Sequence, residues 1–497
     1  MEEPLLTAPD RGREEPQRRL LYEPGRIVRN FGIAVAGEGL SKGAAFLALI
    51  VVARTLPRED FGRFSFTVAL VSIALLFADV GLQVAATRAI ASDRARASRY
   101  VTAALVAGGS VAATAYALVA GAGALRLLPH DAGRPVAIFG TVLLLAVPIN
   151  ALWSLLRGYE RQDLVYLNYA VSSVALLAAV IIGSRFGITL DGVLLIYVGA
   201  FALRLVLTIA TVETRVERFR WSFDRGAVRV VLVAAQAAAV AYILQDVYSH
   251  VDVVLLGFLV HAADVGSYSA AYRLVDAVTF LTAGALTAAV FPVFSRLAVE
   301  APERVPRLYE RIVRLLVVGL VLGSLALVAF ASQLVHIVYG FGDRTAHLLA
   351  LLAPSTLLIP LNFTTTYLAL ATGRARAAIL STGIAALVNV IANLVAVPLA
   401  GVEAAAGATL LAEVTMVVVF QLALRRAGFE SQALRTAVVG GGIAALPLAL
   451  ALTLPHRSLI AAAGAMGAVP LLVLGGVVRR DDLTAIRSAA VSRPAHV

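Results

Sequence analysis

The chain has 497 residues, of which 60% are hydrophobic and 15% are charged, and its 42 Lys and Arg exceed its 31 Asp and Glu by a formal net charge of +11. A soluble domain carries about 25% charged residues. Together with a mean hydropathy of +0.86, the composition excludes a soluble globular enzyme, a disordered chain and a nucleic-acid-binding protein with a basic surface patch. It indicates an integral membrane protein.

Residues 1–28 hold Pro, Glu and Arg without an apolar run, which predicts a disordered cytoplasmic tail and not a cleaved signal peptide. Fourteen apolar stretches follow, and a helix needs about 20 apolar residues to cross a bilayer. We therefore predict an all-α polytopic membrane protein with about 14 transmembrane helices. The predicted spans are 31–53, 64–86, 101–125, 135–156, 164–182, 191–213, 231–260, 267–294, 315–339, 346–372, 377–399, 401–424, 436–454 and 458–477.

The arginines predict the orientation, because short cytoplasmic loops hold an excess of Lys and Arg. The even-numbered loops and the two tails hold 31 of the 42 cations, and the odd-numbered loops hold 8. Both termini are therefore predicted to be cytoplasmic, in a multi-pass protein of the plasma membrane. The net charge requires no nucleic acid, since it reflects topology and contact with anionic lipid heads. Three cations remain inside spans, namely Lys42, Arg204 and Arg273.

A short repeat indicates internal symmetry. The segments 60–65 and 264–269 share the pattern D-[FV]-G-x-[FY]-S at an offset of 204 residues, and five of the twelve positions from Asp60 to Val71 are identical in the two copies. Six spans separate the copies, so the halves are predicted to be parallel repeats, an architecture of transporters. The predicted units are a six-helix bundle at 29–229, a second at 230–430, two extra C-terminal helices at 431–478 and a cytoplasmic tail at 479–497.

Several sequence blocks carry a family resemblance. They are Arg29-Asn30 through Ala53-Arg54-Thr55-Leu56, Asp60-Phe61-Gly62, Asp79-Val80-Gly81-Leu82 through Thr87-Arg88, then 251–257, 265–274 and a predicted turn at Phe291-Pro292-Val293. In these blocks the chain resembles the polysaccharide-exporting flippases of the multidrug/oligosaccharidyl-lipid/polysaccharide superfamily. The resemblance implies two six-helix bundles in a V around a polar cavity. It also implies substrates that are sugars or oligosaccharides on an isoprenoid pyrophosphate, moved from the inner to the outer leaflet.

Ionisable side chains inside spans are the candidate site residues, because each costs about 2.5–3.5 kcal/mol on insertion scales and generally faces a cavity or a partner. Glu38 and Lys42 lie four residues apart in the favourable order for an ion pair, and Lys42 is the only lysine in the chain. We predict that Lys42 binds the substrate pyrophosphate and that Glu38 holds it when the cavity is empty. The alternative is a self-neutralised pair packed between helices, with Gly39 and Gly43 as small residues at the contact.

The other arginines near the spans leave two interpretations open. Arg273 and Asp276 form a second predicted pair, which serves either the substrate or only itself. Arg88 lies at the cytoplasmic mouth of the second span, where it could meet an arriving pyrophosphate, although we favour a positive-inside anchor. Arg204 is predicted to extend toward the inner surface.

Four carboxylates and four tyrosines complete the candidate set. Asp79 and Asp246 are the preferred candidates for binding a coupling proton or sodium ion, ahead of Asp252 and Glu413; the alternative is that these acids neutralise arginines. We predict that the tyrosines belong to an interfacial aromatic belt and do not stack on sugars. They are Tyr242, Tyr248, Tyr268 and Tyr272.

Missing motifs narrow the function further. The chain has no G-x-x-x-x-G-K-[ST] segment for ATP, and its seven histidines lack metal-ligand spacing. We therefore expect no catalytic residue, no metal and no cofactor. The predicted function is a flippase, not an enzyme, and the expected partners are an isoprenoid-pyrophosphate-linked glycan, the bilayer and a proton or sodium ion, with the protein a monomer.

Three alternatives remain from the sequence. The first is a multidrug and toxin extruder of the same superfamily, which would use the six intramembrane carboxylates but gains nothing from Lys42 and Arg273. The second is a membrane glycosyltransferase with acids on its first outer loop, where Glu59 and Asp60 lie. The recurrence of Asp60 as Asp264 favours a role in fixing the loop instead. The third is a structural scaffold with a degenerate cavity.

Overall fold

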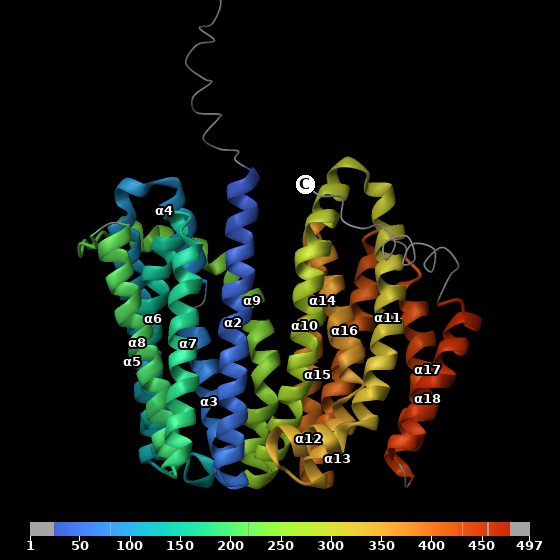
Figure 1. Ribbon diagram of the computed structural model, residues 1–497. Helices are drawn as coiled ribbons and strands as arrows, with labels where there is room; N and C mark the ends of the chain where they lie inside the picture. Colours follow the sequence, from blue (N-terminus) through green and yellow to red (C-terminus); the bar gives the residue numbers. More distant parts are fainter. Residues whose placement is uncertain (1–23, 80, 217, 430, 455–456, 478–497) are drawn as a thin grey trace, which may run out of the picture.

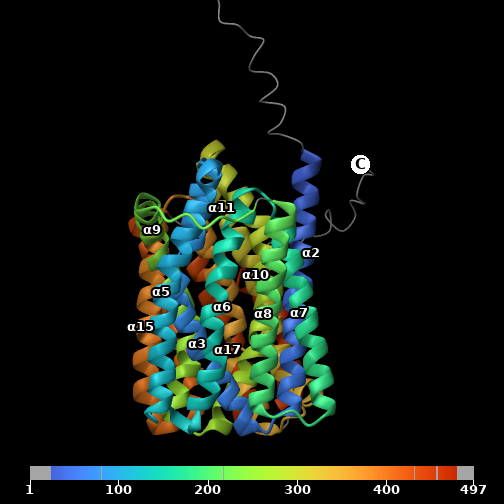
Figure 2. The same ribbon diagram turned by 90° about the vertical axis from the view of Figure 1, so that its left-hand side faces the viewer.

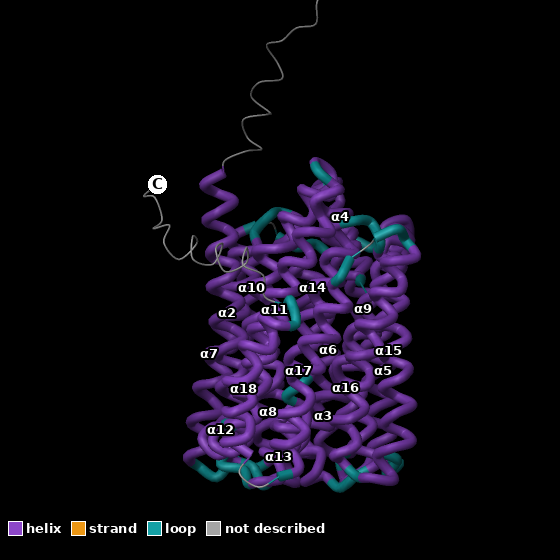
Figure 3. The backbone as a smooth tube through the Cα atoms, turned by 90° about the vertical axis from the view of Figure 1, so that its right-hand side faces the viewer, coloured by secondary structure: helices purple, strands orange, loops and turns teal. Residues whose placement is uncertain are grey.

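The structure is a computed structural model that describes residues 24–477 except 80, 217, 430 and 455–456, with side chains described from residue 36 onward except 237–247 and 280–289. The predicted tails at 1–28 and 479–497 therefore lie largely or wholly outside the described residues. All regular structure in the described part is helical, and its helices run between two layers of loops (Figure 3). This confirms the predicted all-α class.

The helices form two bundles side by side, with a helix pair beyond the second bundle (Figures 1 and 2). The first bundle, or N-lobe, contains α2 (Pro24–Thr55), α3 (Arg58–Asp79), α4 (Leu82–Ser92), α5 (Ala97–Ala124), α6 (Gly133–Gly158), α7 (Gln162–Arg185) and α8 (Leu190–Arg215). The second bundle, or C-lobe, contains α9 (Arg225–Leu259), α10 (Ala262–Glu300), α11 (Val305–Ala329), α12 (Ala331–Tyr339), α13 (Asp343–Leu352), α14 (Ser355–Ala371), α15 (Ala375–Ala400) and α16 (Val402–Arg426). The pair beyond it is α17 (Ala433–Thr453) and α18 (Arg457–Leu474), and three 3₁₀ turns are η1 (Arg94–Arg96), η2 (Pro129–Asp131) and η3 (Pro302–Arg304).

The helix lengths match a multi-pass membrane protein. Among the described residues, twelve helical segments are long and apolar enough to cross a bilayer. Helices α9 and α10 are 35 and 39 residues long, and neither enters that count because each includes residues outside the described side chains. With α9 and α10 added to these twelve, the number of crossings equals the predicted fourteen.

Two predicted boundaries are wrong. The ninth span was expected to run to residue 339, but α11 ends at Ala329 and α12 is a separate short helix at one end of the bundle (Figure 1). The reason is the length of α11: its 25 residues already rise about 37 Å at about 1.5 Å per residue. This is enough to cross the bilayer before residue 339 is reached. The predicted turn at Pro292 is also wrong, since α10 stays helical through that proline to Glu300.

The packing of the helices confirms the parallel repeat. Helix α2 packs on α7 as α9 packs on α15, α5 packs on α6 as α11 packs on α14, and α6 packs on α8 as α14 packs on α16. In the same way α7 packs on α8 as α15 packs on α16. Each pair in the N-lobe thus recurs six crossings later. Helices α17 and α18 pack on each other and on α11, outside this symmetry.

The two copies of the repeated motif meet at the lower end of Figure 1, which the arginine distribution predicts to face outward and which we call the outer end. There α3 packs on α10, and Gly62 lies against Gly266. A Cβ atom on Gly62 would overlap the carbonyl oxygen of Ala262, and a Cβ atom on Gly266 would lie 2.5 Å from the carbonyl oxygen of Arg58. Only glycine permits this approach of the two backbones.

A second contact between the lobes lies beside it. The Arg54 guanidinium, at the end of α2, donates from Nε to the carbonyl oxygen of Val338 at 2.7 Å and also donates to the carbonyl oxygen of Ile337. These are among the last carbonyls of α12, which have no partner within the helix. The guanidinium of Arg58 lies 5.4 Å from the centre of the Phe341 ring. The outer end is therefore closed by contacts between the two lobes.

Candidate functional site

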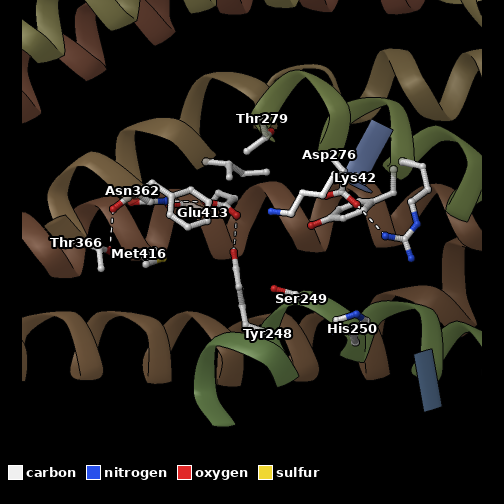
Figure 4. A pocket seen from close by; sticks show the side chains of 14 residues that line it. Lys42, Tyr248, Ser249, His250, Asp276, Thr279, Asn362, Thr366, Glu413 and Met416 are labelled. Atoms are coloured by element: carbon white, nitrogen blue, oxygen red, sulfur yellow. Dashed lines mark hydrogen bonds and ion pairs between the residues drawn. The ribbon is translucent and has the colours of Figure 1, made fainter. Parts of the chain in front are cut away.

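A cavity of about 360 Å³ lies between the lobes, and we call it the Lys42 cavity (Figure 4). Lys42 enters it from α2 of the N-lobe, whereas the remaining walls come from the C-lobe helices α9, α10, α14 and α16. The charged and polar groups in its lining are Lys42, Tyr248, Ser249, His250, Tyr272, Arg273, Asp276, Thr279, Asn362, Thr366 and Glu413. The structure thus brings the predicted residues Lys42, Arg273 and Asp276 into one site.

The predicted pair of Glu38 and Lys42 is present, with Nζ 2.8 Å from Oε1. Both side chains are about 40% exposed, at 40% and 43% respectively. The packed alternative is wrong, because no atom of another helix lies within 4 Å of where a Cβ atom on Gly39 or Gly43 would stand. This face of α2 borders open space and not a neighbouring helix.

The second predicted pair has the same character. Arg273 Nη1 lies 3.3 Å from Asp276 Oδ2, and both side chains are 41% exposed. An ion pair that is this exposed contributes little on its own and can exchange partners readily. Two cations from opposite lobes, each held by its own carboxylate, therefore face one cavity.

Glu413 is a further acid in the wall of this cavity, and its side chain is nearly inaccessible, with 2% exposed. Its carboxylate accepts hydrogen bonds from the Tyr248 hydroxyl at 2.7 Å and from Asn362 Nδ2 at 2.6 Å (Figure 4). The sequence interpretation ranked it behind Asp79 and missed both partners. Asn362 is the only amide side chain in the predicted span 346–372, and that is the signal that could have found it.

Asp252 is buried nearby in the C-lobe, with 6% exposed. Its Oδ1 accepts from Asn393 Nδ2 at 3.1 Å, and its Oδ2 accepts from the Thr409 and Tyr268 hydroxyls at 2.9 and 3.1 Å. The Oδ1 atom of Asn393 is buried and has no hydrogen-bond partner among the described residues. Asn389, four residues earlier, faces the same cluster through Asn393. The result is a buried group of oxygen atoms around one carboxylate.

Two predictions about side-chain placement are wrong. Tyr268 is fully buried, Tyr272 stacks on it, and both Tyr248 and Tyr268 donate to buried carboxylates. Tyr248 and Tyr268 therefore belong to the bundle interior and not to an interfacial belt, because the buried acids need donors. Tyr272 lies there too, against Tyr268 and the Lys42 cavity. Tyr242 lies outside the described side chains.

Arg204 does not extend to the surface either. It is 9% exposed, its Nε donates to Ser172 Oγ at 2.9 Å, and its guanidinium lies 4.2 Å from the ring centre of Tyr169. Phe201 adds a second ring at 4.9 Å. Cation–π contacts with two rings stabilise the charge between α7 and α8, so it needs no path to the inner surface.

The remaining candidates lie elsewhere. Arg88 is exposed on α4 and is not part of the described lining of the Lys42 cavity. Asp246 lies outside the described side chains. Asp79 ends α3 and borders a second cavity of about 380 Å³, which we call the Asp79 cavity. Its polar lining is Ser72, Asp79, Gln83, Asn150, Arg157 and His250. His250 lines both cavities, so they adjoin.

Comparison with known proteins agrees with this architecture. A family model described as "Polysaccharide biosynthesis protein" matches residues 27–298, and one described as MatE matches residues 237–395. No curated protein matches the chain by sequence. The first interval includes both Lys42 and Arg273.

Three solved structures share the fold. The lipid II flippase MurJ in an inward closed conformation is 11% identical with a TM-score of 0.70, covering 91% of this chain and 99% of that one. An inward-facing multidrug resistance transporter of the MATE family is 15% identical with a TM-score of 0.64, covering 79% of this chain and 98% of that one. A MOP superfamily transporter from Pyrococcus furiosus is 14% identical with a TM-score of 0.55, covering 80% of this chain and 95% of that one. These likenesses show the fold of MOP superfamily transporters. Because its family model spans more than half of the chain, the protein belongs to the polysaccharide biosynthesis protein family, as its sequence blocks predicted.

Proposed function

We propose that the protein is a flippase that moves isoprenoid-pyrophosphate-linked sugars from the inner to the outer leaflet of the plasma membrane. The observation that carries the proposal is the meeting of Lys42 and Arg273, from opposite lobes, in one cavity. A pyrophosphate head cannot cross hydrocarbon alone, because burying an uncompensated charge is prohibitive. Two cations on opposite lobes supply that compensation at a site that both lobes share.

Loading the site exchanges ion partners. In the empty cavity Glu38 and Asp276 neutralise Lys42 and Arg273. An arriving pyrophosphate offers several anionic oxygens to the same cations, and charge-assisted hydrogen bonds of this kind are stronger than neutral ones. The two carboxylates then turn away into the water of the cavity. Opening the contacts at the outer end while the inner end closes would present the head to the outer leaflet.

A reconstituted system tests the proposal. Purified protein in liposomes should translocate a labelled polyprenyl-pyrophosphoryl hexose between leaflets at a rate at least tenfold above protein-free liposomes. It should move an organic cation such as ethidium no faster than those controls do. Translocation of ethidium with no movement of the lipid would reverse the assignment.

The second candidate is extrusion of organic cations. It is favoured by Glu413, which lies buried in the cavity wall with a tyrosine as its partner, and acids with aromatic neighbours suit a cationic ligand. The two functions respond oppositely to loss of Lys42: flipping of an anion needs that charge, whereas binding of a cation improves without it.

The buried oxygens around Asp252 are the proposed site of a coupling sodium ion. Carboxylate, amide and hydroxyl oxygens are the ligands preferred by hard cations, and Asn393 Oδ1 lies there without a partner among the described residues. An inside-negative potential already favours outward movement of an anion by about 2.3 kcal/mol per charge per 100 mV. Sodium bound at this site of the C-lobe would couple outward transport of the lipid to the sodium gradient.

Asp252→Asn is expected to abolish the response of transport to a sodium gradient. This change keeps the shape of the side chain and removes its charge, so a sodium gradient should stimulate the wild type several-fold and leave the variant unaffected. Flipping driven by membrane potential alone should persist in both. The measurement is lipid translocation in liposomes under imposed sodium and potassium-diffusion gradients. Equal stimulation of both proteins by sodium would remove Asp252 from this role.

A further inference from the structure

The Asp79 cavity has no part in the mechanism above, although it adjoins the Lys42 cavity. It lies where the second crossing is interrupted, since α3 ends at Asp79 and α4 begins at Leu82 after Gly81, whose φ is 74°. Helix α6 supplies the facing wall through Asn150 and Arg157. Breaks in membrane helices are characteristic of ligand sites, because the irregular backbone is tolerated only in protein or beside water.

Hydrogen bonds join four of the six polar residues of this cavity, Asp79, Gln83, Asn150 and Arg157, into one network. Asp79 accepts from Asn150 Nδ2 at 3.1 Å and from the Gln83 backbone N–H at 3.3 Å. Arg157 donates from Nη1 to Gln83 Oε1 at 2.8 Å. A carboxylate has about four acceptor positions and a guanidinium has five donors. The network therefore holds its groups in place and leaves both donors and acceptors to face the cavity.

The charges in this network discriminate between ligands. Arg157 disfavours a bound cation, and Asp79 disfavours a bound anion, because each would lie beside a like charge. An apolar group is disfavoured too, since it would cover polar atoms without pairing them. A neutral ligand rich in hydroxyl groups satisfies the network, because each hydroxyl both donates and accepts. Sugars are the ligands of this kind that the proposed function supplies.

We propose that the Asp79 cavity binds the glycan of the transported lipid while the Lys42 cavity holds its pyrophosphate, an inference that rests on the proposed function. The separation of the two sites suits this division. Gly62 and Gly266 are in contact, Arg273 follows Gly266 by 7 residues and Asp79 follows Gly62 by 17. At about 1.5 Å per residue, Asp79 lies about 15 Å nearer the inner end than Arg273. Sugars beyond the pyrophosphate would extend in that direction.

Binding measurements on the full-length protein in lipid nanodiscs test the division. The probes are polyprenyl pyrophosphate itself and the same lipid carrying one, two or three hexose units. Asn150→Ala and Gln83→Ala should each weaken binding of at least one sugar-bearing lipid about tenfold and leave the bare lipid unchanged. Lys42→Ala should weaken all four. Asn168→Ala is the matched control, since this asparagine lies on α7 of the same lobe, outside the described lining of both cavities, and should change none.

The outcomes separate the two proposals. If wild-type protein binds no sugar-bearing lipid more tightly than the bare one, the glycan site is wrong. It is equally wrong if Asn150→Ala and Gln83→Ala weaken all four lipids alike or none of them, while both variants keep the wild-type melting temperature. If Lys42→Ala leaves the bare lipid's affinity unchanged, the pyrophosphate site, and with it the proposed function, fails instead.

Discussion

Gly62→Ala is expected to abolish lipid flipping while the protein remains folded. The added methyl group would overlap the carbonyl oxygen of Ala262, so α3 and α10 must separate at the outer end. Overpacking of this kind costs about 1–3 kcal/mol, and each 1.4 kcal/mol changes a population about tenfold. The cost falls only on the state whose outer end is closed. The state with a closed outer end should therefore become roughly fivefold to a hundredfold rarer.

Cysteine labelling measures this shift, because the chain contains no cysteine of its own. A single cysteine introduced at Thr366, in the Lys42 cavity, should react faster with a membrane-impermeant maleimide added from outside in the Gly62→Ala background. Gly266→Ala, at the equivalent repeat position, should behave alike. Gly323→Ala is the matched control, because nothing lies within 4 Å of its Cβ position. Normal flipping together with unchanged labelling in Gly62→Ala would show that the glycine contact does not gate transport.

Lys42→Ala is expected to reduce flipping of the polyprenyl-pyrophosphoryl hexose about a hundredfold. Loss of one partner of a charged, hydrogen-bonded contact costs about 2–5 kcal/mol, and Lys42 is the only cation that the N-lobe adds to the described lining of its cavity. The measurement is the initial flipping rate in liposomes, with the melting temperature as the check on folding. Lys42→Arg keeps the charge and should retain part of the rate.

Removing the charge of Glu38, the ion-pair partner of Lys42, is expected to have the opposite effect on pyrophosphate affinity. Glu38→Gln removes the carboxylate that lies 2.8 Å from Nζ in the empty site, so the ammonium becomes available and pyrophosphate affinity should rise several-fold. Arg126→Ala, which changes a cation of an outer loop, serves as the control. A variant Lys42→Ala that flips lipid at the wild-type rate, or that extrudes ethidium faster than the wild type, would contradict the flippase assignment.

The fold could be predicted because the bilayer constrains the amino-acid composition of each span and each loop. Apolar length determines each crossing, and the bias of arginines determines the alternation of loops. The pairs of Glu38 with Lys42 and of Arg273 with Asp276 were also predictable, since partners four and three residues apart share one helical face. These contacts are local, and no knowledge of tertiary packing is needed to find them.

The other site residues depend on contacts between helices distant in sequence. Tyr248 and Glu413 lie 165 residues apart, and nothing in either segment names the other. Arg157 was counted only among loop cations, yet it stands in the last turn of α6 and lines a cavity. Arg204 was expected to extend toward the inner surface, but cation–π contacts with Tyr169 and Phe201 stabilise it in the bundle interior. Packing geometry decided each of these cases.

The meeting of Gly62 with Gly266 has a consequence for the origin of the chain. The two glycines occupy equivalent positions of parallel halves, and each backbone approaches the other's copy of the same motif. A residue that meets its own counterpart is the hallmark of an isologous, twofold-symmetric dimer interface. A single ancestral six-helix subunit would have found a self-complementary surface here, and gene fusion would then have preserved the joint that two separate copies once formed.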